Sequence, residues 1–269
     1  MLKTRLIPVL LLMDGALVRS EQFRTHQIIG NPIHEVERFN EWNVDELIYL
    51  DISRKPYCGG RRDDQKVRGV TSHLDILDAV SRTCFMPLTW GGGIRSIEEM
   101  RERFARGADK ITVNTAAHDD LGLVTRAAKA YGSQAVVVSI DVLRRPDGSP
   151  EVVTAMGTRP TGLDPASWAR CVQEAGAGEI LLQCVDRDGT GAGYDLEVVS
   201  MVAAATRIPV IALSGVGRFE DYAAAVTAGA AAVAAANIWH FKELSDRQGK
   251  RALSRAGIET RLPPGRKGR

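Results

Sequence analysis

The chain has 269 residues, of which 44% are hydrophobic and 25% are charged, and its formal net charge is +2. This composition is typical of a globular protein with one large domain or two small ones. The small net charge argues against a general attraction to nucleic acid, and the apolar runs are too short to span a membrane.

The amino terminus does not resemble a secretion signal. Its apolar stretch Leu6–Met13 runs directly into Asp14, without a small-residue cleavage site. The cysteines are widely spaced, and no pair has the spacing of a metal site or a redox motif. They are Cys58, Cys84, Cys171 and Cys184. We therefore expect a cytoplasmic protein with reduced thiols, no metal and no cofactor.

Eight short apolar runs recur along the chain at intervals that leave room for a helix between them. None is joined to the next by a tight hairpin, so we expect buried, parallel strands. The predicted strands are Arg5–Leu12, Glu46–Ile52, Pro87–Trp90, Lys110–Val113, Ala135–Ile140, Glu179–Cys184, Pro209–Leu213 and Ala231–Ala235.

Amphipathic stretches lie between these runs and are predicted to form helices. Two of them follow a residue that can cap a helix, Ser96 and Asp164. The segment Leu143–Met156 differs, because Arg145-Pro146-Asp147-Gly148 between two extended runs indicates a hairpin inserted after the fifth strand. The predicted helices are Pro32–Glu41, Ser72–Ser81, Ile97–Arg106, Leu121–Ala130, Pro165–Ala175, Leu196–Ala205 and Phe219–Ala228.

This alternation of strands and helices indicates a (β/α)8 TIM barrel of the α/β class rather than an open doubly wound sheet. An internal repeat supports it, since a shift of 122 positions places Pro87 on Pro209 and Gly93 on Gly215 without a gap. Such a repeat indicates two half-barrels. We expect a single domain over residues 1–262 and a basic flexible tail over residues 263–269.

Glycines follow the third and seventh predicted strands, as Gly91–Gly93 and Gly215. Backbone N–H groups left bare at a turn that opens a helix bind phosphate, so the repeat predicts two phosphate cradles. The alternative is that these glycines serve the geometry of the turn alone. Their occurrence in both copies favours a functional role.

The chemistry of a TIM barrel lies at the carboxyl ends of its strands. There Asp141 follows the apolar run Val136-Val137-Val138, and apolar surroundings raise the pKa of a carboxyl group into a range useful for acid–base catalysis. Asp14, Asp51 and Asp188 lie at other strand ends, where a carboxylate can instead cap a helix or fix a loop.

Several motifs resemble the cyclase subunit of imidazole glycerol phosphate synthase, a lyase of histidine biosynthesis. They are Asp45-Glu46-Leu47, Gly91–Gly93, Gly107-Ala108-Asp109-Lys110, Asn114-Thr115-Ala116-Ala117, Gly132-Ser133-Gln134-Ala135, Gly178-Glu179-Ile180-Leu181-Leu182 and Asp186-Arg187-Asp188-Gly189-Thr190. The resemblance runs from Leu2 to about Leu262. It implies a barrel of two half-barrels that binds a small molecule with a phosphate at each end.

The resemblance also implies which residues bind this phosphorylated ligand. One phosphate would be held after the third and fourth strands, and the other after the seventh and eighth. The predicted binding residues are Gly91, Gly92, Gly93, Asn114, Thr115, Asp188, Ser214, Gly215, Ala236 and Asn237.

The family closes the imidazole ring with an acid–base pair of aspartates that end the first and fifth strands. Asp141 matches the second aspartate, whereas the first falls on Leu11, which can neither donate nor accept a proton. A family threonine falls on Gln183, and the lysine of a mobile loop falls on Arg19. The resemblance therefore does not carry over the complete catalytic pair. The loss of one general acid or base typically costs about 10²–10⁴-fold in rate, so we expect ring closure to be impaired.

In this family a glutaminase forms a heterodimer with the amino-terminal face of the barrel and sends ammonia through its core, past a gate of four charged residues. The matching residues are Arg5, Glu46, Lys110 and Glu179. Asp109 would contact the glutaminase. The alternative for the four charges is a purely structural ring of salt bridges, since buried charges must be paired.

The ammonia entrance is intact while the site above it is altered. In this respect the chain resembles the cyclase-like proteins of surface-polysaccharide gene clusters, which are associated with glycosyl amidation. Ile7–Leu12 before Asp14-Gly15, together with Cys84–Leu88 and Thr161–Pro165, carries this second resemblance. It implies that the chain supplies ammonia to a sugar amidotransferase, which is the function we predict. Two alternatives stay open: the cyclase of histidine biosynthesis and a non-catalytic activator of the glutaminase. The loop around Cys58 is either a lid or a partner contact.

Overall fold

The computed structural model describes residues 3–42, 44–54, 72–242 and 245–261. In this part of the chain eight parallel strands close into a barrel, with β1 paired to both β4 and β12 and with β7 paired to β10. The barrel strands are β1 (Arg5–Met13), β4 (Leu47–Asp51), β5 (Leu88–Gly91), β6 (Lys110–Val113), β7 (Val136–Arg144), β10 (Glu179–Cys184), β11 (Val210–Leu213) and β12 (Ala232–Ala235). The predicted TIM barrel is confirmed.

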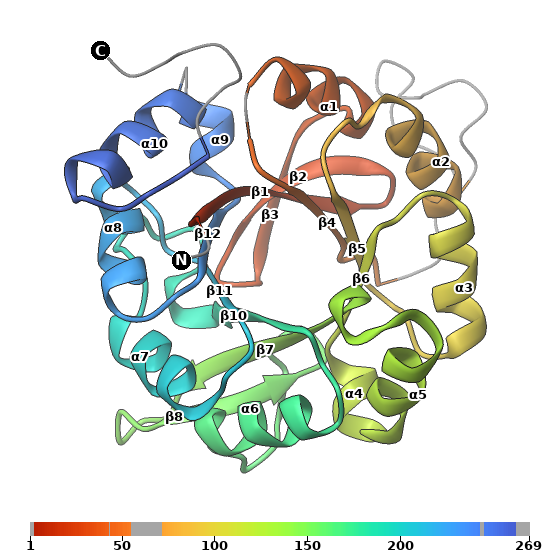
Figure 1. Ribbon diagram of the computed structural model, residues 1–269, viewed down its shortest axis with the longest axis vertical. Coiled ribbons are helices and arrows are strands. Elements are labelled where there is room, and N and C mark those ends of the chain that lie inside the picture. Colours follow the sequence, from red (N-terminus) through yellow and green to blue (C-terminus); the bar gives the residue numbers. More distant parts are fainter. Residues whose placement is uncertain (1–2, 43, 55–71, 243–244, 262–269) are drawn as a thin grey trace.

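Helices form a ring around this barrel (Figure 1). They are α1 (Pro32–Glu41), α2 (His73–Thr83), α3 (Ile97–Ala105), α4 (Thr115–Asp119), α5 (Gly122–Tyr131), α6 (Pro165–Glu174), α7 (Leu196–Ala205), α8 (Glu220–Thr227), α9 (Ile238–Phe241) and α10 (Ser245–Arg255). The two predicted caps are present, since Ser96 accepts a hydrogen bond from the Glu99 N–H and Asp164 accepts one from the Ser167 N–H. Three helices, α4, α9 and α10, were not predicted from the sequence, and the first two of them span a single turn.

Two strands after β1 were also missed. β2 (Ala16–Glu21) pairs antiparallel with both β1 and β3 (Thr25–Gly30), so a hairpin extends from the end of the first barrel strand. Asp14 and Gly15 form the tight turn between β1 and β2, and both have positive φ, 51° and 79°. A two-residue Asp-Gly turn of this kind matches the twist of antiparallel strands.

The hairpin predicted after the fifth strand is confirmed. β7 continues past the barrel to Arg144 and pairs antiparallel with β8 (Pro150–Thr154), which in turn pairs with β9 (Arg159–Pro160). Two short 3-10 helices, η2 (Ser133–Ala135) and η3 (Val185–Arg187), flank the adjoining strands β7 and β10. Both hairpins therefore project from the carboxyl ends of barrel strands, the end at which the phosphate cradles were predicted.

The buried apolar side chains form two layers. The larger lies between the strands and the surrounding helices, and the smaller fills the inside of the barrel. The inner layer consists of Ile7, Val9, Leu11, Val18, Ile48, Leu50, Val137, Leu181, Ile211, Leu213, Ala232 and Ala234. These residues alternate with outward-facing ones along the strands, as the period of two in a β-strand requires.

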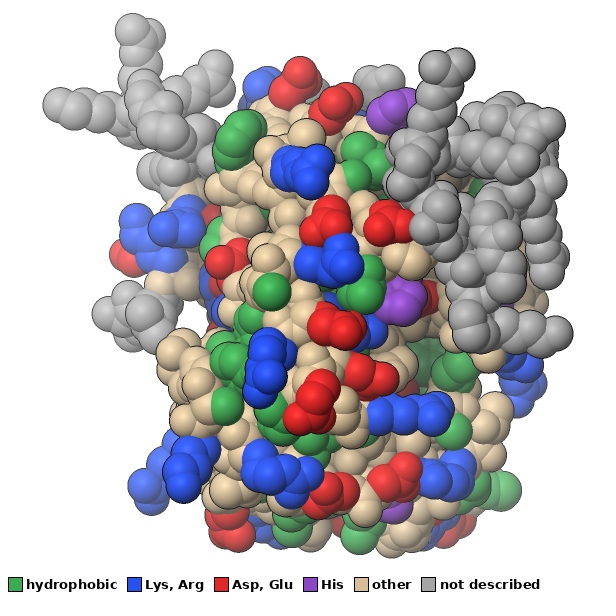
Figure 2. All heavy atoms as spheres, turned by 90° about the vertical axis from the view of Figure 1, so that its right-hand side faces the viewer, with side chains coloured by type: hydrophobic (Ala, Val, Ile, Leu, Met, Phe, Trp, Pro, Cys, Tyr) green, Lys and Arg blue, Asp and Glu red, His purple; other side chains and the backbone are tan. Residues whose placement is uncertain are grey.

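The outer surface over α2 and α3 carries acidic and basic side chains side by side, without a large area of one sign (Figure 2). This mixture agrees with the small net charge of +2. No helix in the described ranges combines the length and the apolar character needed to cross a bilayer.

A buried ion pair fastens α10 to the beginning of the barrel strands. Asp45 accepts a hydrogen bond from the Leu6 N–H at 2.8 Å and pairs with the ammonium group of Lys250 at 3.0 Å. Asp109 makes the matching contact with the Leu88 N–H, also at 2.8 Å, but its side chain is exposed. The two aspartates therefore share a backbone contact and differ in burial.

We expect Asp45→Ala to lower the free energy of unfolding by about 3–5 kcal/mol, because it removes the carboxylate that pairs with the buried Lys250 ammonium group and accepts from the Leu6 N–H. Asp109→Ala is the matched control, and it should cost about 1 kcal/mol, the value of one hydrogen bond. Urea unfolding followed by circular dichroism measures both. Equal losses in the two variants would contradict a structural role for the Asp45–Lys250 pair.

Candidate active site

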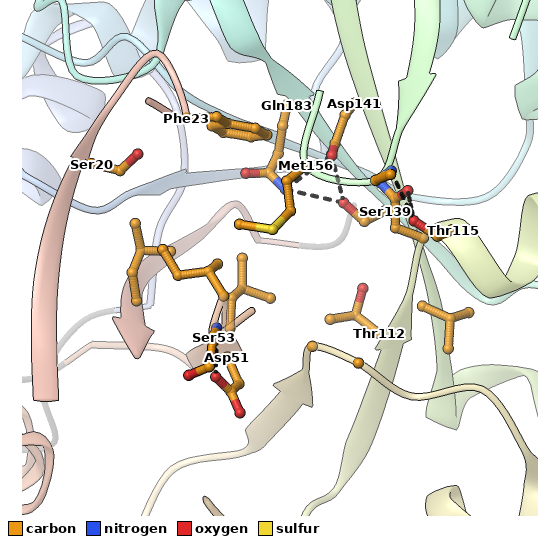
Figure 3. A pocket seen from close by; sticks show the side chains of 18 of the residues that line it. Ser20, Phe23, Asp51, Ser53, Thr112, Thr115, Ser139, Asp141, Met156 and Gln183 are labelled. Atoms are coloured by element: carbon orange, nitrogen blue, oxygen red, sulfur yellow. Dashed lines mark hydrogen bonds between the residues drawn. The ribbon is translucent and has the colours of Figure 1, made fainter. Parts of the chain in front are cut away.

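A cavity of about 550 Å³ opens among the carboxyl ends of the barrel strands. Polar side chains of β7 and β10 line one wall, and the hairpins β2–β3 and β8–β9 contribute Phe23 and Met156 from above (Figure 3). Apolar side chains of β1, β4 and β11 line the rest of its floor. The floor of the cavity is therefore polar at β7 and β10 and apolar at β1 and β4, while Asp51 and Ser53 line it just beyond the end of β4.

Ser139, Asp141 and Gln183 form a hydrogen-bonded group on the polar wall, here called the polar triad. Ser139 and Asp141 lie two residues apart on β7 and so point to the same side of the strand, while Gln183 is the residue of β10 that pairs with Asp141. The Gln183 amide donates to Asp141 Oδ1 at 3.2 Å and to Ser139 Oγ at 3.1 Å. The Ser139 hydroxyl donates to the same Asp141 oxygen at 3.2 Å.

Burial raises the pKa of Asp141 to about 7, although hydrogen bonds from Ser139, Asn114 and Gln183 act in the opposite direction. The side chain is only 5% exposed. An aspartate with this pKa exchanges a proton near neutral pH, which is the property a general acid or base needs. The sequence-based expectation for Asp141 agrees with its surroundings.

Val9, Leu11 and Leu50 face the polar triad from the other half of the barrel and are here called the apolar triad. Leu11 is 8% exposed, belongs to the inner core layer and pairs with Leu50 across β1 and β4. All three line the cavity. At the end of the first strand the cavity therefore has an apolar surface, and Leu11 supplies no second proton-transferring group.

The first glycine cradle lies at the turn after β5. Gly92 has φ 107°, and a Cβ there would lie 2.0 Å from the Asp51 carbonyl oxygen, so this position requires glycine. The space around a Cβ at Gly93 is open. Asn114 and Thr115 adjoin the same cavity, and the Thr115 hydroxyl accepts a hydrogen bond from the Ala155 N–H at 3.0 Å. The structure thus brings together Gly92, Gly93, Asn114 and Thr115 at the cavity. Gly91 is the buried last residue of β5 and does not line it.

The second glycine cradle forms a separate hollow of about 240 Å³ after β11 and β12. Ser214, Gly215, Ala236 and Asn237 line it, and the basic side chains of Arg19 and Lys242 lie at its edge. A Cβ at Gly215 would lie 2.2 Å from the Gly193 carbonyl oxygen, so the backbone here also requires glycine. Backbone N–H groups beside two cations suit an anion.

Asp188 lies between the two hollows and lines both. Its carboxylate accepts hydrogen bonds from the Ser20 hydroxyl at 2.7 Å and from the Phe23 N–H at 3.3 Å, and burial raises its pKa. The Asn237 amide donates to the Ser20 carbonyl oxygen at 2.9 Å. In this structure Asp188 and Asn237 therefore hold the β2–β3 hairpin across the site.

Four charged side chains close a ring at the opposite end of the barrel. Arg5 contacts Glu46 at 2.6 Å and Glu179 at 2.9 Å, while Lys110 contacts the same two carboxylates at 3.2 Å and 3.1 Å. This charge ring alternates in sign, and each side chain is at most 20% exposed. Gln183 lies four residues beyond Glu179 on β10, roughly 13 Å away, with the inner apolar layer between them.

Other aspartates have local roles. Asp109, expected to contact a partner, binds the Leu88 N–H, and its side chain remains exposed. Asp51 accepts a hydrogen bond from the Ser53 N–H at 2.9 Å, which fixes the loop after β4. Cys58 lies outside the described residues. Ser139 was not predicted as a site residue. It could have been, because it stands two positions before Asp141 on a predicted strand, so both side chains must point to the same side.

The geometry first defines a class: a TIM barrel with a buried acid and two glycine cradles at one end and a closed charge ring at the other. Comparison with known proteins then identifies the family. The family model described as "Histidine biosynthesis protein" matches residues 5–245. The chain belongs to this family, and the predicted resemblance is confirmed.

Two relatives come from Caulobacter vibrioides, strains NA1000 / CB15N and ATCC 19089 / CIP 103742 / CB 15. Each is named imidazole glycerol phosphate synthase subunit HisF, and each is 43% identical to this chain over 264 residues. The match covers 97% of this chain and 97% of each relative. The similarity therefore includes both ends of the barrel.

Asp141→Asn should be more stable than the unmodified protein at about pH 8, by up to about 4 kcal/mol. The carboxyl group has a pKa of about 7 in the folded chain and an ordinary value of 3.8, so folding favours its protonated form. Its contribution to stability is complete below about pH 4 and is lost as the pH rises through about 7. The difference between the two proteins should therefore shrink toward about pH 5.

Urea unfolding at several pH values measures this difference. Asp120→Asn is the control, because Asp120 is exposed and its pKa is lowered by its hydrogen bond with Arg126, which places its titration below this pH range. A stability difference for Asp141→Asn that does not vary with pH would contradict the raised pKa.

Proposed function

We propose that this chain is the ammonia-using subunit of a glutamine-dependent synthase of the imidazole glycerol phosphate synthase type. Ammonia from a glutaminase subunit enters at the charge ring, crosses the inside of the barrel and reaches the cavity beside Asp141. A phosphorylated small molecule binds at the glycine cradles. The closed charge ring beneath an apolar interior is the observation that carries this proposal.

The charge ring supports entry of a neutral molecule from below. Its four side chains are mutually paired, which lowers the cost of placing them at the end of an apolar interior. Between the charge ring and the cavity the barrel interior is apolar, with Ile7, Leu181 and Ala234 in its core layer. A route through these surroundings would favour uncharged ammonia over ammonium, because moving an isolated charge into them is costly. If the charge ring served only to stabilise the fold, opening it would not change the fraction of ammonia that reaches the cavity.

The proposed reaction at the cavity is ring closure, as the names of the two relatives imply. The match at 43% identity covers nearly the full length of each relative, and the two cradles suit a ligand with a phosphate at each end. In this reaction Asp141 handles the proton that the incoming nitrogen loses or gains. Glutaminase and barrel would then work as a heterodimer.

Leu11 favours a second candidate. In the described structure the apolar triad faces Asp141, so the end of β1 lacks the carboxyl group that a pair of aspartates on β1 and β7 would require. In this candidate the barrel delivers ammonia to a sugar amidotransferase of surface-polysaccharide synthesis, and the phosphorylated ligand regulates that delivery. The two candidates share the charge ring and differ in the chemistry done at the cavity.

Lys110→Met should uncouple glutamine hydrolysis from nitrogen transfer, because it opens the charge ring and leaves Glu46 and Glu179 paired only with Arg5. We expect most of the ammonia to appear in bulk solution, measured as free ammonia released per glutamine hydrolysed by the complex. Arg126→Met removes a surface ion pair whose side chains are 56% and 57% exposed, and it serves as the control. Unchanged coupling in Lys110→Met would contradict the entry route.

Leu11→Asp should raise the rate of ring closure about 10²-fold or more if the cavity is otherwise suited to that reaction, because it restores a second acid–base group. Product formation with added ammonium salt measures this rate without the glutaminase. Leu50→Asp, which places a carboxyl group at the neighbouring position of the apolar triad, is the control and should give no gain.

Growth of a histidine-requiring strain that lacks its cyclase subunit separates the two candidates. Growth with the unmodified chain, or with Leu11→Asp alone, supports ring closure as the reaction for which the cavity is built. Failure of both variants, with stable protein present in the cells, overturns ring closure and supports delivery of ammonia to a sugar amidotransferase.

A further inference from the structure

The two halves of the barrel differ at three matching positions. In the first half Val9 and Leu11 lie two residues apart on β1, and Leu11 pairs with Leu50 of β4. The second half repeats this arrangement with the polar triad on β7 and β10. All six residues line the same cavity. The same architecture therefore carries an apolar triad on one side and a polar triad on the other.

This comparison shows that the fold does not need polar residues at these positions. Val9, Leu11 and Leu50 satisfy the packing of the first half with apolar side chains alone. Burying a serine, an aspartate and a glutamine is costly unless their polar groups are paired. The three are 7%, 5% and 8% exposed, so their hydrogen bonds to one another replace contacts with water. We conclude that the polar triad is kept for the chemistry of the cavity.

The hydrogen bonds of the triad converge on one atom. Asp141 Oδ1 receives both the Gln183 amide and the Ser139 hydroxyl, and the Gln183 amide also donates to that hydroxyl (Figure 3). Gln183 thus holds the carboxylate directly and also through Ser139. Two donors on a single oxygen restrict rotation of the carboxyl group and stabilise its ionised form.

We propose that Gln183 and Ser139 are positioning residues for Asp141. They fix the orientation of its carboxyl group at the end of the barrel interior and set the pH range over which it is ionised. The inference deepens the proposed function, because it rests on Asp141 as the proton-handling group of that site. It holds for either of the two candidate reactions.

Asn114 and Asp188 also act on Asp141. The hydrogen bond from Asn114 lowers the Asp141 pKa less than the bond from Ser139 does and more than the bond from Gln183. The neighbouring carboxylate of Asp188 raises the Asp141 pKa. The remaining titratable residues that line the cavity are His26, Asp51, Arg54 and Arg95. None of these four contributes a hydrogen bond to Asp141 in the described structure. The variants tested below leave Asn114 and Asp188 in place, so a change in the Asp141 titration reports the loss of a triad donor.

The test measures ionisation of Asp141 without any substrate. ¹³C NMR of protein labelled at aspartate carboxyl carbons follows the titration, and Asp141→Asn assigns the signal. Gln183→Leu and Ser139→Val place at each site the residue type that the apolar triad carries, so both should fold. We expect both to raise the midpoint of the Asp141 titration above about 7, and Ser139→Val to raise it more than Gln183→Leu, because the ionised form loses a donor and the Ser139 bond lowers the pKa more.

Thr112→Val is the matched control. Thr112 is buried and lines the same cavity, but its hydroxyl has no hydrogen-bond partner in the described structure, so the Asp141 midpoint should not change. An unchanged midpoint in both Gln183→Leu and Ser139→Val would overturn the proposal. Gln183→Glu provides a second test: two carboxyl groups in contact should titrate in two coupled steps, and a single unperturbed step would overturn the proposal as well.

Failure of this inference is distinguishable from failure of the proposed function. The NMR titration requires neither glutaminase nor substrate, whereas the ammonia-coupling measurement requires the complex and does not depend on Gln183. A normal effect of Lys110→Met together with an unchanged Asp141 titration would leave the ammonia route intact and remove only the positioning role.

Discussion

Closure of eight parallel strands is the constraint on which the other features depend. Because side chains alternate along each strand, every second residue of the closed sheet must point inside, and residues at the same height meet there. The interior therefore consists of layers: the charge ring at the bottom, apolar side chains such as Ile7 and Leu181 above it, and the two triads at the top. Remote segments of the chain become neighbours only through this closure.

The half-barrel repeat explains why most of the fold could be predicted. Each strand is a short apolar run bounded by polar residues, and the two copies confirm each other's boundaries, so Lys110–Val113 and Glu179–Cys184 were predicted to the residue. The β2–β3 hairpin was missed although Asp14-Gly15 is a strong turn signal. Polar residues such as Arg19 and Thr25 interrupt the apolar pattern of these strands, because these side chains lie above the barrel rather than in its core.

The sequence allowed us to predict which residues lie at the candidate site, but not which hydrogen bonds join them. The position of Asp141 follows from its place at a strand end, and the charge ring follows from charged residues at strand starts. The partners of Asp188 could not be predicted, because the hairpin that supplies Ser20 was itself missed. Likewise, the bond between Gln183 and Asp141 joins residues 42 positions apart, and nothing local distinguishes it from other pairs of strand ends.

Repetition also shows where the two halves have diverged. Gly92 in the first cradle corresponds to Ser214 in the second, and both have positive φ, 107° and 89°. A serine in this conformation costs about 1–3 kcal/mol, a cost that glycine avoids. Its buried hydroxyl has no partner among the described residues, so the local hydrogen bonds do not compensate for this strain. The second cradle thus tolerates strain where the first requires glycine.

The divergence of the triads has a chemical consequence for a nitrogen nucleophile. Uncharged ammonia is reactive, whereas ammonium is not, and water or a strong acid at the top of the interior would favour ammonium. The apolar triad places no polar side chain opposite Asp141 on the cavity floor, and Asp141, with a pKa of about 7, remains partly ionised and able to accept a proton near neutral pH. Asp141 can therefore take up the proton that the nitrogen releases after it has attacked its acceptor, whichever acceptor that is.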